Sequence, residues 1–314
     1  MSVLTRFFPA RRPRNTCEVQ VGVYSGTERL LTATAQAQPG KKPRLALAPA
    51  FDGPQAAEQL THWLQAQLPQ SQTTVLLHGG HYRIVPLDAP RVPPEERRSA
   101  VRYQAQELLD FGPDESSIDC LEVPSAVQGQ AATRVFVVAG LKREIGHWMG
   151  LYRAAKLNLR AVDIPEMALR NLSVLAAGDS AHIYLHVGLN SSRLVIVWQR
   201  ELCAFRHFEV SSRAIHQATG AEIEGHIEQL ALEVQRTADA FGRQFHGADL
   251  SALWVSSVTR LDDVAKALAL LQSLPVKRLL IEELVDWQGE QSPCDFNTAM
   301  DHTLALGAAL RGMS

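Results

Sequence analysis

Hydrophobic and polar positions along the first part of the chain predict three strands followed by a helix. The strands fall within residues 17–49, where Ser25-Gly26 and Pro39-Gly40 mark the turns between them. Residues 54–68 carry apolar side chains at helical spacing, so they predict a helix. We therefore expect the chain to open with an α/β unit.

The same order of elements returns near residue 181. We expect three strands and a long helix at 181–187, 193–198, 202–210 and 223–245. A strand, a helix, a strand and a last helix follow at 252–255, 261–273, 277–281 and about 297–311. Ala176–Ser180 is small and polar and contains glycine, so it predicts a boundary between halves at 1–178 and 179–314. This duplicated order is what a fold of two similar α/β halves requires.

The stretch between the two repeats predicts further elements. Apolar runs at 73–77 and 82–87 surround Gly79-Gly80, which is typical of a hairpin. The prolines at 90, 93 and 94 end that unit, and Pro94 suits the first turn of a helix. The elements expected beyond them are a helix at 95–109, strands at 118–124 and 133–140, a helix at 142–155, a strand at 158–162 and a helix at 165–175.

Composition narrows the class of protein. Hydrophobic residues make up 46% and charged residues 20% of the 314 residues, as in an ordinary globular protein. The formal net charge of −2 argues against a basic surface, so we expect no nucleic-acid partner. Cys17, Cys120, Cys203 and Cys294 form no Cys-x-x-Cys pair, which favours a reducing compartment and gives no zinc pattern.

The sequence gives no indication of a membrane span or a signal peptide. No apolar run approaches the roughly 18–20 residues that a span needs. Phe7 and Phe8 precede the basic residues Arg11, Arg12 and Arg14. This end of the chain fits either contact with an anionic membrane leaflet or a solvated terminus.

Residues 86–175 carry the most specific string of the chain. Its parts are Pro86-Leu87-Asp88-Ala89-Pro90-Arg91, Tyr103-Gln104-Ala105-Gln106-Glu107-Leu108-Leu109, Val137-Val138-Ala139-Gly140-Leu141-Lys142 and Leu159-Arg160-Ala161-Val162-Asp163-Ile164-Pro165-Glu166. This string resembles the PilM family of type IV pilus assembly proteins. Within that family it is most similar to the MshI group of agglutinin-pilus biogenesis.

The resemblance extends over nearly the whole chain and implies an actin-like ATPase fold. It implies two ribonuclease-H-like halves, an inserted subdomain at about 88–165 and a last helix at about 297–311 that returns toward the first half. It also implies a cytoplasmic protein at the inner face of the inner membrane. Such a protein would bind the N-terminal tail of a PilN-like membrane protein and associate with the membrane through it. The assembly ATPase of the pilus is a further partner that the resemblance suggests.

In proteins of this fold, two hairpins hold the nucleotide phosphates, and each carries an Asp and a glycine-bearing turn. The equivalents in the first hairpin are Gly22, Ser25, Gly26 and Thr27. Val23 and Tyr24 stand where the Asp is expected. The first hairpin therefore keeps its turn and lacks its carboxylate.

The second hairpin and the adenosine motif also depart from the pattern. The hairpin equivalents are Gly188, Ser191 and Ser192. His186 replaces the Asp, and a neutral imidazole is a poor ligand for Mg²⁺, which prefers hard oxygen ligands. Ser256 and Ser257 stand where a Gly-Gly pair approaches the adenosine, and their Cβ atoms impair that approach.

These departures favour a protein that keeps the actin-like fold but lacks the ATPase activity. We expect no catalytic residue, no ATP hydrolysis, no metal site and no cofactor, although binding of ATP with Mg²⁺ stays open. The main hypothesis is a non-catalytic scaffold of a type IV pilus machine. An active actin-like ATPase of the same machinery is the alternative. A third is the cytoplasmic part of a GspL-like type II secretion component, which is disfavoured because no membrane span follows residue 314.

Two further groups of side chains invite a functional interpretation. Ile145, Trp148, Met149 and Tyr152 form a helical stripe. The stripe fits either a partner-binding groove beside the inserted subdomain or a face of the core. His78-Gly79-Gly80-His81 lacks the third ligand of a zinc site and is interpreted as a turn.

Overall fold

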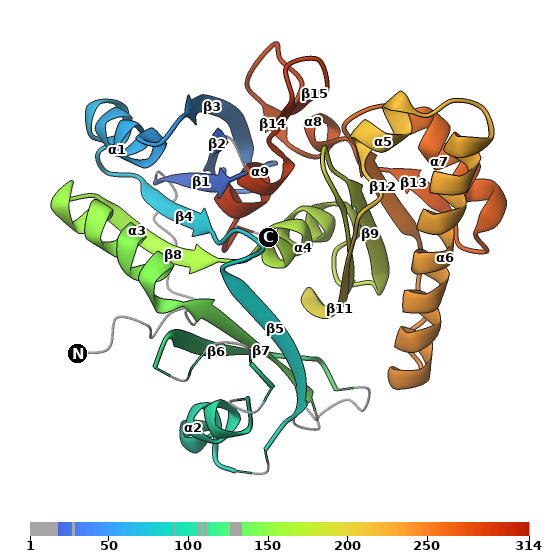
Figure 1. Cartoon of the computed structure of the whole chain (residues 1–314), viewed down its shortest axis with the longest axis horizontal. Coiled ribbons are helices and arrows are strands. Elements are labelled where there is room, and N and C mark those ends of the chain that lie inside the picture. Colours follow the sequence, from blue (N-terminus) through green and yellow to red (C-terminus); the bar gives the residue numbers. More distant parts are fainter. Residues whose placement is uncertain are drawn as a thin grey trace.

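The computed structural model describes residues 18–26, 29–90, 92–105, 108–109, 112, 114–125 and 134–313. Two large β-sheets, one three-stranded sheet and one two-stranded sheet organise these residues, and helices pack around them (Figure 1). Thr27, Cys17 and the basic residues at 11–14 lie outside the described residues. None of the helices in the described part of the chain is both long and apolar enough to cross a bilayer.

The first large sheet has the strand order β14-β3-β2-β1-β4-β8. Strands β1, β2 and β3 pair antiparallel, whereas β4 and β8 run parallel to β1, and β14 (Asp286–Trp287) runs parallel to β3. Helix α1 leads from β3 to β4 and buries Leu60 and Leu64. The bounds are β1 Val19–Ser25, β2 Arg29–Gln36, β3 Arg44–Asp52, α1 Ala56–Gln67, β4 Gln72–Leu76 and β8 Asn158–Asp163.

The second large sheet repeats this arrangement in the order β11-β10-β9-β12-β13. Three antiparallel strands are again followed by a helix and by strands parallel to the first one. Both halves are therefore ribonuclease-H-like, and the chain has the expected actin-like ATPase fold. The bounds are β9 His182–Val187, β10 Ser192–Trp198, β11 Glu201–Phe208, α5 Ser212–Gln217, α6 Ala221–Gln244, β12 Leu253–Ser257, α7 Leu261–Leu271 and β13 Val276–Arg278.

The third sheet belongs to an insertion between β4 and β8. It has the order β5-β7-β6 and carries helix α2, while α3 returns to the first sheet. The prediction of a hairpin around Gly79-Gly80 is wrong, because β4 and β5 do not pair with each other. Strand β4 lies between β1 and β8, and β5 pairs with β7. The bounds are β5 Tyr82–Asp88, α2 Pro94–Ala105, β6 Ser116–Glu122, β7 Arg134–Leu141 and α3 Lys142–Ala154.

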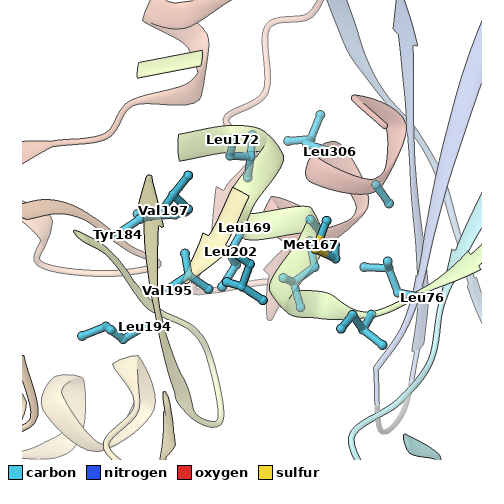
Figure 2. Packing of buried hydrophobic residues seen from close by; sticks show 14 of the residues in the cluster. Leu76, Met167, Leu169, Leu172, Tyr184, Leu194, Val195, Val197, Leu202 and Leu306 are labelled. Atoms are coloured by element: carbon cyan, nitrogen blue, oxygen red, sulfur yellow. The ribbon is translucent and has the colours of Figure 1, made fainter. Parts of the chain in front are cut away.

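Two helices fill the space between the large sheets. α4 (Pro165–Ala177) packs on β9, β10 and β11, and α9 (Thr303–Ala309) packs on β1, β2 and β4. Each half thus contributes a helix to the sheet of the other half. Figure 2 shows Leu169 and Leu172 of α4 between Leu306 of α9 and the side chains of the second sheet. This exchange buries a continuous apolar core across the two halves.

The end of the chain differs from the expected helix at 297–311. α9 starts only at Thr303, and before it β15 (Cys294–Asp295) pairs with β16 (Met300–Asp301). The Asp295 carboxylate accepts hydrogen bonds from the Asn297 amide and the Thr298 hydroxyl at 3.0 and 2.7 Å. Such local bonding favours a turn over a helix. Helix α8 (Ile281–Leu284) and strand β14 (Asp286–Trp287), with α5, are further elements that the sequence did not predict.

Candidate functional site

The two motif hairpins both contact a segment near the end of the chain. The first turn lies between β1 and β2, and the second lies between β9 and β10. Residues Thr298–Asp301 contact both. The Arg29 guanidinium, just after the first turn, lies 3.3 Å from the Thr298 carbonyl oxygen and 3.3 Å from the Met300 sulfur. Asp301 lies against the second hairpin, at His186.

His186 projects from β9 on the face that meets this segment. In the sheet it pairs with Arg193 of β10 and Ser256 of β12, so the three residues are direct cross-strand neighbours. Its Nδ1 lies 2.8 Å from the Ser256 hydroxyl, which lies 2.8 Å from the Tyr184 hydroxyl. The imidazole is 2% exposed, so its ring nitrogens need partners inside the protein.

Asp301 provides the second partner of that imidazole. Its Oδ2 lies 2.9 Å from His186 Nε2, and its Oδ1 accepts a hydrogen bond from the Thr303 amide at 3.2 Å. Burial alone would raise the pKa of Asp301, but the charge of His186 and hydrogen bonds from His186 and Thr303 outweigh it. The pKa therefore lies well below its usual range, and Asp301 is a carboxylate.

The Asp301 carboxylate occupies the space in front of Gly188. A Cβ atom built on Gly188 would lie 3.2 Å from Asp301 Oδ2 and 3.3 Å from His186 Nε2. The Gly188 amide itself donates to the Ser191 carbonyl oxygen at 3.1 Å. A phosphate that approached this glycine, as the motif requires, would meet a negatively charged carboxylate.

Gly22 of the first hairpin is used for packing. A Cβ atom there would overlap the backbone carbonyl of Ala305 and crowd the Ala309 amide of α9. Gly307 has the same role where α9 meets α4, because a Cβ atom on it would overlap the Ala168 carbonyl of α4. The two glycines allow α9 to wedge between β1 and α4.

The remaining motif equivalents lie near the same junction, and several of their polar atoms have partners within the protein. Ser25 and Gly26 are half-buried at the first turn, and the Gly26 amide donates to the Arg29 carbonyl at 2.9 Å. The Ser192 hydroxyl donates to the Val210 carbonyl at 2.6 Å, and that of Ser257 donates to Thr259 at 2.6 Å. Ser191 is half-buried.

A second polar cluster adjoins the first. Tyr82, at the start of the insertion, donates to the Glu166 carboxyl, whose two oxygens both lie 2.9 Å from the hydroxyl. Burial raises the pKa of Glu166, although Arg193 opposes the shift. Arg193 also interacts electrostatically with Tyr24 of β1. The cluster thus joins both halves and the insertion through three buried side chains and the half-buried Tyr24.

The predicted partner stripe turns out to face the core. Ile145, Trp148 and Tyr152 are 4%, 7% and 1% exposed, and they pack into the main hydrophobic cluster. Met149 is half-buried against the same cluster. The groove interpretation is therefore wrong for the first three, because α3 must cover the first sheet and uses this face to do so.

Some residues at the junction escaped the sequence analysis. Asp301 lies inside the segment expected to be helical, although an Asp two residues before the apolar run at 303–310 is a helix-start signal. Arg193, Glu166 and Tyr82 meet only in the folded chain, so local patterns do not mark them. Among the described residues, no group of three or more His, Cys, Asp or Glu is placed to hold a metal ion.

Comparison with known proteins supports the fold. The chain is similar to a solved structure described as a PilM-PilN type IV pilus biogenesis complex, with 20% identity and a TM-score of 0.69 over 96% of this chain and 100% of that chain. It is also similar to the cytoplasmic domain of EpsL from Vibrio cholerae, an inner-membrane component of the type II secretion system. That match has 10% identity and a TM-score of 0.52 over 85% of this chain and 92% of the other.

At these identities the likeness shows a shared fold. No protein-family model matches the chain, and no curated protein is similar to it. The fold supports both nucleotide-dependent and nucleotide-independent proteins, so the function has to be argued from the site.

Proposed function

We propose that the protein is a non-catalytic scaffold of a type IV pilus assembly machine, of the PilM type and, on the string at 86–175, of its MshI group. It would act at the cytoplasmic face of the inner membrane. It would bind the N-terminal tail of a PilN-like membrane protein and be held at the membrane through that tail. The observation that carries the proposal is the fold likeness to the PilM-PilN complex, which spans 96% of the chain.

The non-catalytic part of the proposal is supported by the hairpin geometry. The place of the motif Asp is taken by His186, which is bonded to the chain's own Asp301. Gly22 is covered by α9, and Gly188 faces the Asp301 carboxylate. These residues do not fit a Mg²⁺-bound triphosphate. Neither hairpin carries a carboxylate of its own for the ion, and the Asp301 carboxylate, already bonded to His186, would face the phosphates.

The tail is expected to bind beside the insertion, near residues 88–165, by adding a strand to a sheet. Backbone hydrogen bonds would give affinity and alternate side chains would fill pockets. A tail of this kind orders only when it binds, so its affinity for the contact area should be modest. Because Ile145, Trp148 and Tyr152 are core residues, the contacts must come from other side chains of this region.

A binding experiment tests the proposal. The full chain is immobilised and exposed to the solubilised membrane fraction of its host, and captured proteins are identified by mass spectrometry. We expect a single-span protein with a short cytoplasmic tail. A synthetic peptide of that tail should then protect amides within 88–165 from hydrogen exchange, and a scrambled peptide should not. Protection confined to 181–313 would contradict the proposed docking region.

A second candidate is a scaffold of a type II secretion system, favoured by the likeness to the cytoplasmic domain of EpsL. The same capture experiment separates the two. A secretion-system component in place of a PilN-like protein would favour this candidate. Release of phosphate from ATP by the purified chain would instead favour an active ATPase of the pilus machinery.

A further inference from the structure

The segment Asp286–His302, which we call the strap, contacts both halves of the molecule. In Figure 1 its strands β14 and β15 lie at the top of the view, where the two halves meet. In the first half, β14 adds to the edge of the sheet beside β3, and the Asp286 carboxylate accepts hydrogen bonds from Gln38 and Arg44 at 2.9 and 3.3 Å. Arg29 adds its contacts to Thr298 and Met300.

In the second half the strap is fastened at two points. Asp301 pairs with His186 at 2.9 Å, and this pair is nearly buried, with side chains 2% and 14% exposed. The Phe296 ring lies 4.0 Å from the His216 imidazole, measured between ring centroids. The strap therefore contacts both halves, and its Asp301 carboxylate, which we call the anchor, contacts the second motif hairpin.

The Asp301 anchor is held rigidly in place. The Thr303 amide, the His186 imidazole and, at 3.5 Å, the Cys294 thiol all surround its carboxylate. Thr303 opens α9, which is wedged between the two halves by Gly22 and Gly307. A carboxylate fixed by backbone on one side and by a buried imidazole on the other is pre-organised for this one partner.

We infer that the strap is a built-in clamp that fixes the angle between the two halves in place of a bound nucleotide, with the Asp301–His186 pair as its fastening. In a two-halved molecule, a group that contacts both halves favours their closed arrangement while it stays in place. Here that group is part of the chain. The halves are therefore closed without a ligand, whichever partner the scaffold binds.

The clamp is tested by the distance between the halves in the full chain. Dyes are attached through unnatural amino acids at Glu58 of α1 and Lys266 of α7, both exposed, so the native cysteines remain. Single-molecule energy transfer should give one narrow distribution for the wild type. Asp301→Ala should add a population with a longer distance between the dyes. This population should be about tenfold or more larger than in the wild type, as expected for ordinary coupling energies.

Glu290→Ala is the matched control, because it removes an exposed carboxylate from the same strap and should leave the distribution narrow. If Asp301→Ala fails to fold, Asp301→Asn keeps the shape and removes the charge, and it should broaden the distribution as well. An unchanged distribution in a folded Asp301 variant would overturn the clamp.

A third measurement adds ATP with Mg²⁺. If the strap is a clamp, the distance distribution of the wild type does not change. A shift in the wild type that Asp301→Ala abolishes would make Asp301 a ligand of the bound nucleotide and would also overturn the clamp. Capture of the membrane partner is measured separately, so a failed clamp leaves the proposed scaffold standing, and a missing partner leaves the clamp standing.

Discussion

The two motif hairpins hold the end of the chain by different means. At the first hairpin, α9 lies directly on β1 because Gly22 has no side chain, and the contact is backbone against backbone. Leu304, Leu306 and Leu310 bury apolar surface around it. Contacts of this kind depend on shape and on the exclusion of water, and they change little with charge.

At the second hairpin the chain end is held by a polar pair of a carboxylate and an imidazole. Asp301 meets His186, and the sheet supports the imidazole through Ser256 and Tyr184. A nearly buried pair adds little net stability compared with apolar packing, yet it is costly to break from one side. We infer from this difference that the packing contact at the first hairpin supplies most of the stability. The polar contact at the second hairpin sets the geometry of the junction.

Restoring the motif carboxylate should give the largest effect. His186→Asp would place two carboxylates against each other in a site with little water. We expect a loss of about 5 kcal/mol in the free energy of unfolding, the upper end of the range for a broken buried pair. Guanidinium unfolding followed by circular dichroism measures it.

The matched control for this substitution is the double variant His186→Asp with Asp301→Asn, which removes the repulsion and should recover part of the loss. Equal losses in the single and double variants would show that the two side chains are not coupled.

The packing contact at the first hairpin should come next. Gly22→Ala would drive a Cβ atom into the Ala305 carbonyl, so strand and helix must separate. We expect a loss of about 3 kcal/mol, the upper part of the usual range for overpacking. Gly146→Ala on the exposed face of α3, where nothing lies near a new Cβ, should instead be neutral or stabilise the protein. A Gly22→Ala variant as stable as the wild type would refute the wedge.

The sequence predicted the fold better than it predicted the site. Strands such as β1 and β9 follow from local apolar patterns, and the duplicated order fixes how they assemble. The site depends on contacts between distant residues. Asp301 and His186 are 115 positions apart, and no local pattern records their pairing.

The errors have physical causes as well. The stripe at Ile145 and Trp148 has the composition of a partner surface and also that of a core face, and only the neighbouring sheet decides between them. Gly22 matched a phosphate motif, but its missing side chain serves helix packing. A glycine marks a close approach and does not say of what.

The stability of the protein should depend on pH in opposite directions for Asp301 and for Glu166. Asp301 has a lowered pKa, so its contribution to stability is present above pH 3.8 and is lost as the pH falls toward the folded-state pKa. Glu166 has a raised pKa, so its contribution is present below pH 4.5 and is lost as the pH rises through the folded-state value.

Glu166→Gln should therefore match the wild type near pH 4 and exceed it at pH 7. The gain should be about 1.4 kcal/mol for each unit by which burial raises the pKa. Urea unfolding across this pH range measures the difference. If Glu166→Gln is less stable than the wild type at pH 7, the ionised carboxylate is the form that the fold uses.

The smallest effect is expected from nucleotide. A ligand that binds only the folded state at 100 times its dissociation constant stabilises it by about 2.7 kcal/mol, which would raise the melting temperature by several degrees. ATP with Mg²⁺ should leave the melting temperature unchanged, because Asp301 faces Gly188 and α9 covers Gly22. Thermal unfolding at millimolar ATP, with and without Mg²⁺, measures this, and ADP serves as a second probe. A clear shift that needs Mg²⁺ would mean that the Asp301–His186 pair opens to admit a ligand. The contrast between the packing contact at the first hairpin and the polar contact at the second would then describe a nucleotide-dependent protein.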